Sequence, residues 1–165
     1  MGCKKCETQA VYVTLHHKKL CKSCFIKYFE KKVHKTITSN KMIEYDEKIG
    51  VGLSGGKDST ACLYLLQKFF KNKGNAIMAI AVDEGIKGYR NKTLDEARIF
   101  CKEHGIPLTI TSYEKEFGFT LDEYLKKHNI NPCSVCGVLR RYLLNKAARR
   151  LKVDKLATGH NLDDE

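Results

Sequence analysis

The sequence lacks a long hydrophobic run, a signal-peptide pattern, an internal repeat and a low-complexity tract. A membrane-spanning helix needs about 18 or more consecutive apolar residues, and no stretch approaches that length. The N-terminus also lacks the apolar segment and the cleavage site of a secretory signal. These absences predict a soluble, cytoplasmic protein with no membrane partner. The 165 residues are enough for one domain with a real core, or for a small module and most of a larger domain.

Positive charge is abundant but unevenly distributed. The formal net charge is +11, and residues 1–48 carry eleven lysines and arginines against five acids. Residues 126–155 carry nine against one, whereas residues 49–125 are balanced. Lysine-rich helices often do no more than solvate a surface. Two basic blocks on either side of a neutral centre favour a surface for a polyanion such as RNA.

The eight cysteines indicate metal or redox chemistry, because a chain without a secretory context has no use for a disulfide framework. Six of them form three Cys-x-x-Cys pairs, which are Cys3 with Cys6, Cys21 with Cys24, and Cys133 with Cys136. The remaining two, Cys62 and Cys101, lie in predicted amphipathic helices, where we expect them to be buried small apolar residues.

The first two pairs predict a structural zinc module. Fourteen residues separate Cys6 from Cys21, which is close to the spacing of zinc ribbons. Four thiolates, from Cys3, Cys6, Cys21 and Cys24, saturate a tetrahedral zinc ion and leave no open position for catalysis. We therefore expect a zinc module over residues 1–24, with a short hairpin inside it, followed by a linker helix over 25–48.

Apolar patterns after residue 48 alternate between strand and helix. The expected strands are 49–53, 76–82, 108–112 and 155–158, and the expected helices are 58–72, 93–104, 120–128 and 137–151. Such alternation predicts a parallel sheet with right-handed crossovers. We expect an α/β, Rossmann-like doubly wound domain over 49–165.

A glycine-rich turn follows the first of these strands, where such sheets usually hold phosphate. The turn comprises Ser54, Gly55, Gly56, Lys57, Asp58 and Ser59. Glycines let backbone N–H groups approach an anion, the following helix adds partial positive charge, and Lys57 adds a full charge. Since bare phosphate would repel Asp58, we expect this carboxylate to cap the helix or to hold Mg²⁺.

Two other nucleotide motifs fit this turn less well. A Walker A loop needs glycine at position 51 and serine or threonine at position 58, where Val51 and Asp58 stand. The spacing of Gly50, Gly52 and Gly55 matches the dinucleotide fingerprint, but that fingerprint must follow a strand. Only Ile49 and a charged run precede Gly50, so Gly50 and Gly52 are better placed inside the strand itself.

The third cysteine pair differs from the first two because Cys133 and Cys136 stand alone. Two thiolates saturate neither zinc nor an iron-sulfur cluster, so the pair needs a further ligand or acts as a dithiol. A second structural zinc site completed elsewhere fits the spacing equally well. The chain closes with Gly159, followed by Asp163, Asp164 and Glu165, and we expect these residues at the same sheet edge as the glycine turn. This acidic string suits Mg²⁺, or simply the start of a helix.

The six residues from Ser54 to Ser59 resemble the signature of the PP-loop ATP pyrophosphatases. Five features in order then resemble the TtuA/CtuA family of tRNA 2-thiouridine synthases. They are the N-terminal cysteine pairs, the glycine turn, the loop 83–90, the pair Cys133 and Cys136 with Gly137, and the string 159–165. The resemblance implies a PP-loop fold of the adenine nucleotide alpha hydrolase type.

The resemblance also implies a reaction. ATP transfers AMP to the C2 oxygen of a tRNA uridine, and sulfur then displaces the activated oxygen. The implied catalytic residues are Asp58, Asp164, Cys133 and Cys136. The implied ATP site comprises Ser54, Gly55, Gly56, Lys57, Asp58, Ser59, Val82, Arg140, Gly159 and Asp164. Cys133 and Cys136 would be two of three protein ligands to a 4Fe-4S cluster, beside Mg²⁺ at the nucleotide and zinc in the N-terminal module.

The implied partners are tRNA and a ubiquitin-like thiocarboxylate carrier or another sulfide donor, with a homodimer as one option. The modified uridine and the sulfur donor stay open. Arg140 replaces a nucleotide-contacting lysine of the family, and its planar guanidinium has a different geometry. Family members continue beyond Glu165 through a third cluster cysteine and a second zinc module, so we expect a chain ending there to be truncated. Alternatives are another PP-loop adenylating ligase, such as a lysidine synthetase, and an inactive zinc-dependent RNA-binding fragment.

Overall fold

A computed structural model describes residues 2–14, 16–128 and 130–161. The chain divides into two compact units, Met1–Glu44 and Tyr45–Glu165. Within the described residues, no helix is both long and apolar enough to cross a bilayer.

The first unit is a cysteine-rich hairpin that continues into one helix. Strands β1 (Tyr12–Val13) and β2 (Lys19–Leu20) pair antiparallel, and helix α1 (Lys22–Ser39) follows at once. Its small core consists of buried Cys3, Leu20 and Cys21, with Phe25 packed against them. The helix begins at Lys22 and belongs to the same unit as the cysteines. The predicted boundary at residue 24 therefore falls inside the helix, and the linker role of 25–48 stays a prediction.

A four-stranded parallel sheet forms the centre of the second unit. Its strands stand in the order β5 (Leu108–Ser112), β4 (Ala76–Asp83), β3 (Lys48–Gly52) and β6 (Lys155–Ala157). All three strand pairs are parallel. The chain moves outward from β3 to β5 and then returns to the other side of β3, so the direction of winding reverses beside β3. The predicted doubly wound sheet is confirmed.

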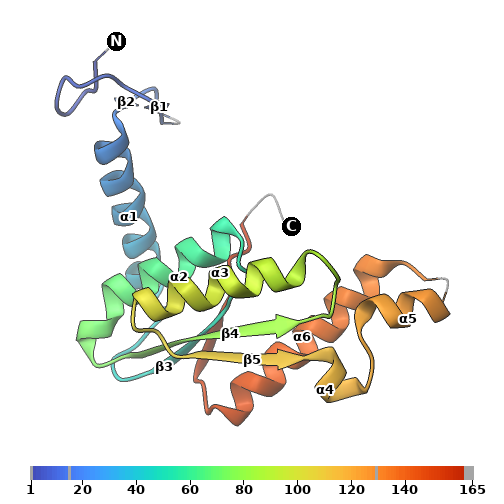
Figure 1. Ribbon diagram of the computed structural model, residues 1–165. Coiled ribbons are helices and arrows are strands. Elements are labelled where there is room, and N and C mark those ends of the chain that lie inside the picture. The colour runs from blue at the N-terminus through green and yellow to red at the C-terminus, as the bar shows by residue number, and fades with distance from the viewer. Residues whose placement is uncertain (1, 15, 129, 162–165) are drawn as a thin grey trace. The chain divides into compact units, whose positions relative to one another are not determined.

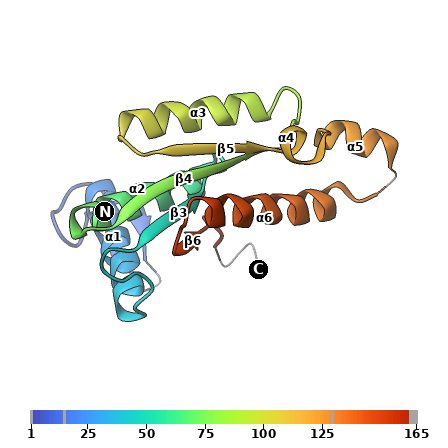
Figure 2. The same ribbon diagram turned by 90° about the horizontal axis from the view of Figure 1, so that it is seen from below.

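Helices cover both faces of this sheet, as Figures 1 and 2 show. Helices α2 (Lys57–Phe70) and α3 (Arg90–Glu103) pack on one face, and α6 (Pro132–Arg150) packs on the other. On the α6 face, buried Ile80 of β4 contacts Ala147 and Ala148. Alternation along β4 explains this arrangement, because neighbouring residues of a strand point to opposite faces.

Three further elements complete the second unit. A 3-10 turn, η1 (Lys71–Lys73), extends α2, and the short helices α4 (Tyr113–Phe117) and α5 (Leu121–Lys127) lie between β5 and α6. The sequence patterns do not predict α4, and they predict a helix from residue 137 where α6 begins at Pro132. The Asn131 side chain accepts a hydrogen bond from the Cys133 N–H group and caps α6, and Pro132 stands in its first turn. Both Cys133 and Cys136 therefore lie within the first five residues of the helix.

Candidate functional site

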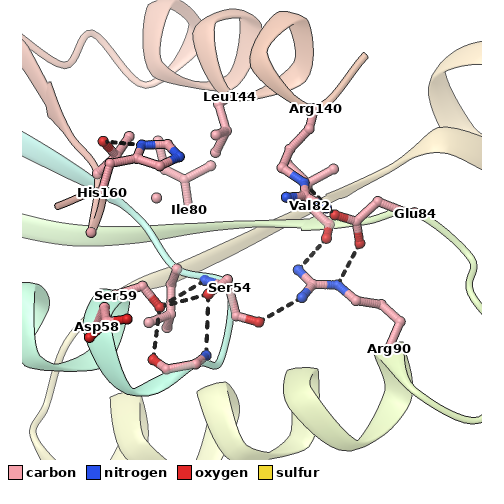
Figure 3. A pocket seen from close by; sticks show the side chains of 15 residues that line it. Ser54, Asp58, Ser59, Ile80, Val82, Glu84, Arg90, Arg140, Leu144 and His160 are labelled. Atoms are coloured by element: carbon pink, nitrogen blue, oxygen red, sulfur yellow. Dashed lines mark hydrogen bonds and ion pairs between the residues drawn. The ribbon is translucent and has the colours of Figure 1, made fainter. Parts of the chain in front are cut away.

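A pocket of about 220 Å³ opens at the carboxyl ends of β3, β4 and β6 (Figure 3). Ligands bind in this position in doubly wound sheets. The glycine turn, the end of β4, the start of α3, helix α6 and the segment after β6 all contribute to its wall. The lining residues are Gly52, Leu53, Ser54, Gly56, Asp58, Ser59, Ile80, Val82, Glu84, Arg90, Arg140, Leu144, Thr158, Gly159 and His160.

Hydroxyl groups fold the glycine turn back on itself. The Ser54 and Ser59 hydroxyls lie 2.9 Å apart, and the Gly56 N–H group donates to the Ser54 hydroxyl at 3.2 Å. The Ser59 hydroxyl also donates to the Gly56 carbonyl. Helix α2 starts immediately afterwards, so the N–H groups of its first turn have no partner within the helix and suit an anion.

Asp58 lies in the first turn of α2 and lines the pocket. The N-cap of this helix is Gly56, and no side chain caps it. The expectation that Asp58 caps the helix is therefore not met. Its carboxylate lies at the pocket instead, where a divalent cation could bind between it and a phosphate.

Two glycines allow very close backbone contacts around the turn. Gly55 has a φ of +86°, and a Cβ atom there would lie 2.5 Å from the Thr93 carbonyl oxygen. Gly159, which follows β6, would place a Cβ atom 2.6 Å from the Ser59 nitrogen. The predicted position of Gly159 at the same sheet edge as the glycine turn is thus what the structure shows.

A chain of charged groups crosses one wall of the pocket (Figure 3). The buried carboxylate of Glu84 forms an ion pair with Arg90 at 2.8 Å and a second ion pair with Arg140 at 2.7 Å. Arg90 also donates to the backbone carbonyls of Ser54 and Val82. A buried carboxylate needs such partners, because desolvation would otherwise favour its neutral form.

Another part of the pocket wall is apolar. Ile80 and Val82 of β4 and Leu144 of α6 line it, and both β4 residues are almost fully buried. A flat heteroaromatic ring suits a surface of this kind. Val82, which the resemblance implies as part of the ATP site, lies in this apolar part of the pocket.

Arg140 connects this pocket with the third cysteine pair. Its Nη2 group donates to the Cys136 sulfur at 3.2 Å, while its Nε group binds Glu84. Cys136 is buried, and the buried Tyr113 hydroxyl donates to its carbonyl at 2.9 Å. Cys133 is exposed one turn earlier on α6. Cysteines three positions apart share one face of a helix, so both thiols can reach one ligand.

The four N-terminal cysteines come together as predicted. The sulfur atoms of Cys3, Cys6, Cys21 and Cys24 all lie within 4.8 Å of one another. Tetrahedral zinc-thiolate bonds of about 2.3 Å place neighbouring sulfurs about 3.8 Å apart, so the cluster fits this ion. Within the described parts of the chain, no other group of three or more potential metal ligands is found.

The close contacts within the cluster give its thiols different pKa values. The Ser23 hydroxyl and the Cys24 backbone N–H group lower the pKa of Cys21 to about 6. The hydrogen bond with Cys6, together with burial, raises the pKa of Cys24 to about 12. A bound divalent ion would favour the thiolate form at all four positions and relieve the mutual repulsion of the charges.

Not every predicted ligand of the nucleotide lines the pocket. Gly55 and Lys57 line a shallow depression between α2 and α3 instead. Asp164 lies outside the described residues. Glu84, Arg90 and His160 line the pocket although the sequence analysis assigns them no role. Two charged residues in a loop directly after a buried strand were the available signal for Glu84 and Arg90.

Comparison with known proteins adds a family match. A family model described as the tRNA methyl transferase HUP domain matches residues 47–164. A probable sulfurtransferase of Methanocaldococcus jannaschii is 47% identical over 96% of this chain and 49% of its own length. The cytoplasmic tRNA 2-thiolation protein 1 of Arabidopsis thaliana is 40% identical over 88% of this chain and 42% of its own length. The chain thus spans about half the length of the curated relatives it matches.

Solved structures give the same picture. The U34-tRNA thiolase NcsA from Methanococcus maripaludis, solved with its 4Fe-4S cluster, superposes with a TM-score of 0.88 at 43% identity. This match covers 99% of the present chain and 54% of that protein. An NH3-dependent NAD synthetase from Campylobacter jejuni has a TM-score of 0.54 at 19% identity, over 75% of this chain and 52% of its own, which shows a shared fold alone.

Proposed function

Because the chain belongs to the tRNA methyl transferase HUP domain family, we propose that it activates a tRNA uridine with ATP for replacement of the C2 oxygen by sulfur. The predicted resemblance to tRNA 2-thiouridine synthases is confirmed, since the relatives include a sulfurtransferase, tRNA 2-thiolation proteins and a U34-tRNA thiolase. We extend from these relatives the tRNA substrate, the position of uridine 34 and action in the cytoplasm.

The pocket supports an ATP site that is polar at one end and apolar at the other. The adenine would pack against Ile80, Val82 and Leu144, and the phosphates would meet the first turn of α2. Asp58 would hold Mg²⁺, and the resemblance adds Asp164. Gly55, Lys57 and Gly159 complete the proposed loop, with Lys57 reaching the phosphates from the outer side of the turn.

The proposed reaction has two steps, adenylation of the uridine and displacement of AMP by sulfur. The uridine C2 oxygen attacks the α-phosphorus of ATP, and the bond to the β-phosphate breaks with release of pyrophosphate. Sulfur then forms a bond to C2, and AMP leaves with the former uridine oxygen. Arg140 would stabilise negative charge near the α-phosphate, because it lines the pocket and is partly exposed.

Cys133 and Cys136 fit a cluster site in their placement and their donor atoms. They lie one turn apart at the start of α6, and the Arg140 guanidinium beside Cys136 offsets negative charge on the thiolates. Such a 4Fe-4S cluster would hold the incoming sulfide for transfer to the activated uridine. The resemblance implies a third protein ligand, which in the family is a cysteine beyond position 165. The Arg140 contact brings the sulfur chemistry to the nucleotide pocket.

The remaining parts of the proposal concern partners and zinc. Zinc would bind the N-terminal cysteine cluster and hold that unit folded, because four thiolates leave no open position. The basic residues of α6, among them Arg141, Arg149 and Arg150, would meet the tRNA backbone. A thiocarboxylate carrier or another sulfide donor would deliver sulfur, and a homodimer remains part of the proposal.

The single observation that carries the proposal is the Arg140 side chain, which lines the nucleotide pocket and also contacts Cys136. The test uses the full chain, reconstituted anaerobically with iron and sulfide and incubated with ATP, sulfide and unmodified tRNA. Digestion of the tRNA and mass spectrometry of its nucleosides should reveal 2-thiouridine, and Cys133→Ala should abolish it. Cys62→Ala is the matched control. Cluster assembly and product unaffected by Cys133→Ala would refute the proposal.

A further inference from the structure

Glu84 is a buried acid that the proposed reaction does not use. It stands directly after β4 and is 2% exposed. Its two carboxylate oxygens serve two different arginines, since Oε2 pairs with Arg90 and Oε1 with Arg140. Those arginines come from opposite faces of the sheet, one at the start of α3 and one on α6. Glu84 therefore joins the two sides of the pocket.

The two arginines differ in how firmly they are held. Arg90 is buried and is also anchored by the carbonyls of Ser54 and Val82, so it would keep its place without the carboxylate. The Arg140 side chain is 46% exposed, and Glu84 is its only carboxylate partner among the described residues. An arginine side chain has many rotamers to lose when it is fixed. Its place in the pocket thus depends on Glu84.

Arg140 is also the residue shared by two parts of the proposed site. Its Nε group binds Glu84, its Nη2 group donates to the Cys136 sulfur, and its guanidinium lines the nucleotide pocket. Guanidinium presents several donors in one rigid plane, so a single arginine can serve all three partners. A lysine at this position would offer one point charge and could not keep the same set of contacts.

We propose that Glu84 is a positioning residue that holds the Arg140 guanidinium between the nucleotide pocket and the Cys136 sulfur. This inference rests on the proposed ATP site and deepens it. Replacing the carboxylate by an amide leaves two guanidinium groups without the charge between them. Arg90 keeps its carbonyl partners, whereas Arg140 turns towards solvent and is lost to the nucleotide.

A double-mutant cycle tests this role in the full chain. The binding constant of a non-hydrolysable ATP analogue is measured by calorimetry for wild type, Glu84→Gln, Arg140→Met and the double variant. Each single change should weaken binding about tenfold, as expected for loss of one charge-assisted contact. The double variant should bind no more weakly than Arg140→Met, because Glu84 acts only through Arg140.

A purely structural role for Glu84 predicts a different result. The loss of affinity caused by Glu84→Gln would then add to the loss caused by Arg140→Met in the double variant, and this result would overturn the inference. Full affinity in Glu84→Gln would overturn it as well. Glu116→Gln is the matched control, because it removes another carboxylate that pairs with α6, at Lys146. It should bind the analogue like wild type. Absence of binding by wild type would refute the proposed ATP site itself. Additive losses in the double variant would instead refute only the positioning role of Glu84.

Discussion

The backbone of Gly159 lies directly against the backbone of Ser59, so that a Cβ atom on Gly159 would come within 2.6 Å of the Ser59 nitrogen. This contact joins the segment after β6 to the first turn of α2. Gly159→Ala should therefore push that segment away from the glycine turn and open the pocket. We expect at least about tenfold weaker binding of an ATP analogue, since overpacking costs about 1–3 kcal/mol.

Gly137→Ala is a suitable control for this change. It lies within α6, and an added Cβ atom would meet only the Arg141 side chain at 3.7 Å, an ordinary contact. Alanine also favours a helix more than glycine does. Equal affinity of the two variants for the analogue, measured by calorimetry, would show that the close contact at Gly159 has no part in nucleotide binding.

Asp58→Asn should separate nucleotide turnover from folding. Asp58 lies in the first turn of α2 and makes no cap, so its loss should lower stability by less than about 1 kcal/mol. Because Asp58 is a proposed Mg²⁺ ligand, the substitution should nevertheless lower magnesium-dependent ATP turnover roughly a hundredfold. Asp95→Asn removes an exposed acid paired with Arg98 and should leave the rate unchanged. Undiminished turnover in Asp58→Asn would remove the magnesium role.

Loss of one cysteine of the N-terminal cluster should release the zinc ion. Cys21 is buried within the cluster, and without it three thiolates remain. Cys21→Ser should therefore lower the zinc content from about one ion per chain towards zero, measured by atomic emission, because structural sites need the complete ligand set. Cys62→Ser, half-buried in α2, should retain zinc. Full zinc content in Cys21→Ser would contradict the four-cysteine site.

Tyr113→Phe should destabilise the second unit without affecting nucleotide binding. The hydroxyl is fully buried and donates to the Cys136 carbonyl, and burial together with the hydrogen bond to the Cys136 thiol raises the pKa of Tyr113. Loss of one buried hydrogen bond should lower the free energy of unfolding by about 1 kcal/mol. Urea unfolding checks this, with Tyr89→Phe at a 62% exposed tyrosine as control. Equal midpoints would show that the bond does not stabilise the start of α6.

Local sequence patterns were sufficient to predict the sheet and the glycine turn. Buried runs such as that of β4 read clearly as strands, and alternation with helices determined the winding. Helix α4 was missed because it has only five residues, although Ser112 as N-cap and Gly118 as C-cap mark its ends. Pro132 after Asn131 likewise marks the true start of α6.

The charged wall of the pocket could not be predicted in the same way. Glu84 meets Arg140 only because β4 and α6 pack together, since Arg140 lies 56 positions after Glu84 in the sequence. Charge and position after a strand single out Glu84, but they do not reveal its partner. The contact between Arg140 and Cys136 spans one helical turn. Predicting this contact from the sequence requires the correct start of α6.

The central claim is that the pocket binds ATP in order to adenylate a tRNA oxygen. The most direct measurement follows ATP labelled at the α-phosphate, incubated with the full chain and with either unmodified tRNA or no RNA. The account predicts labelled AMP and an equal amount of pyrophosphate, formed in step with 2-thiouridine and dependent on tRNA. Cleavage to ADP and phosphate, or AMP formation at the same rate without tRNA, would contradict it.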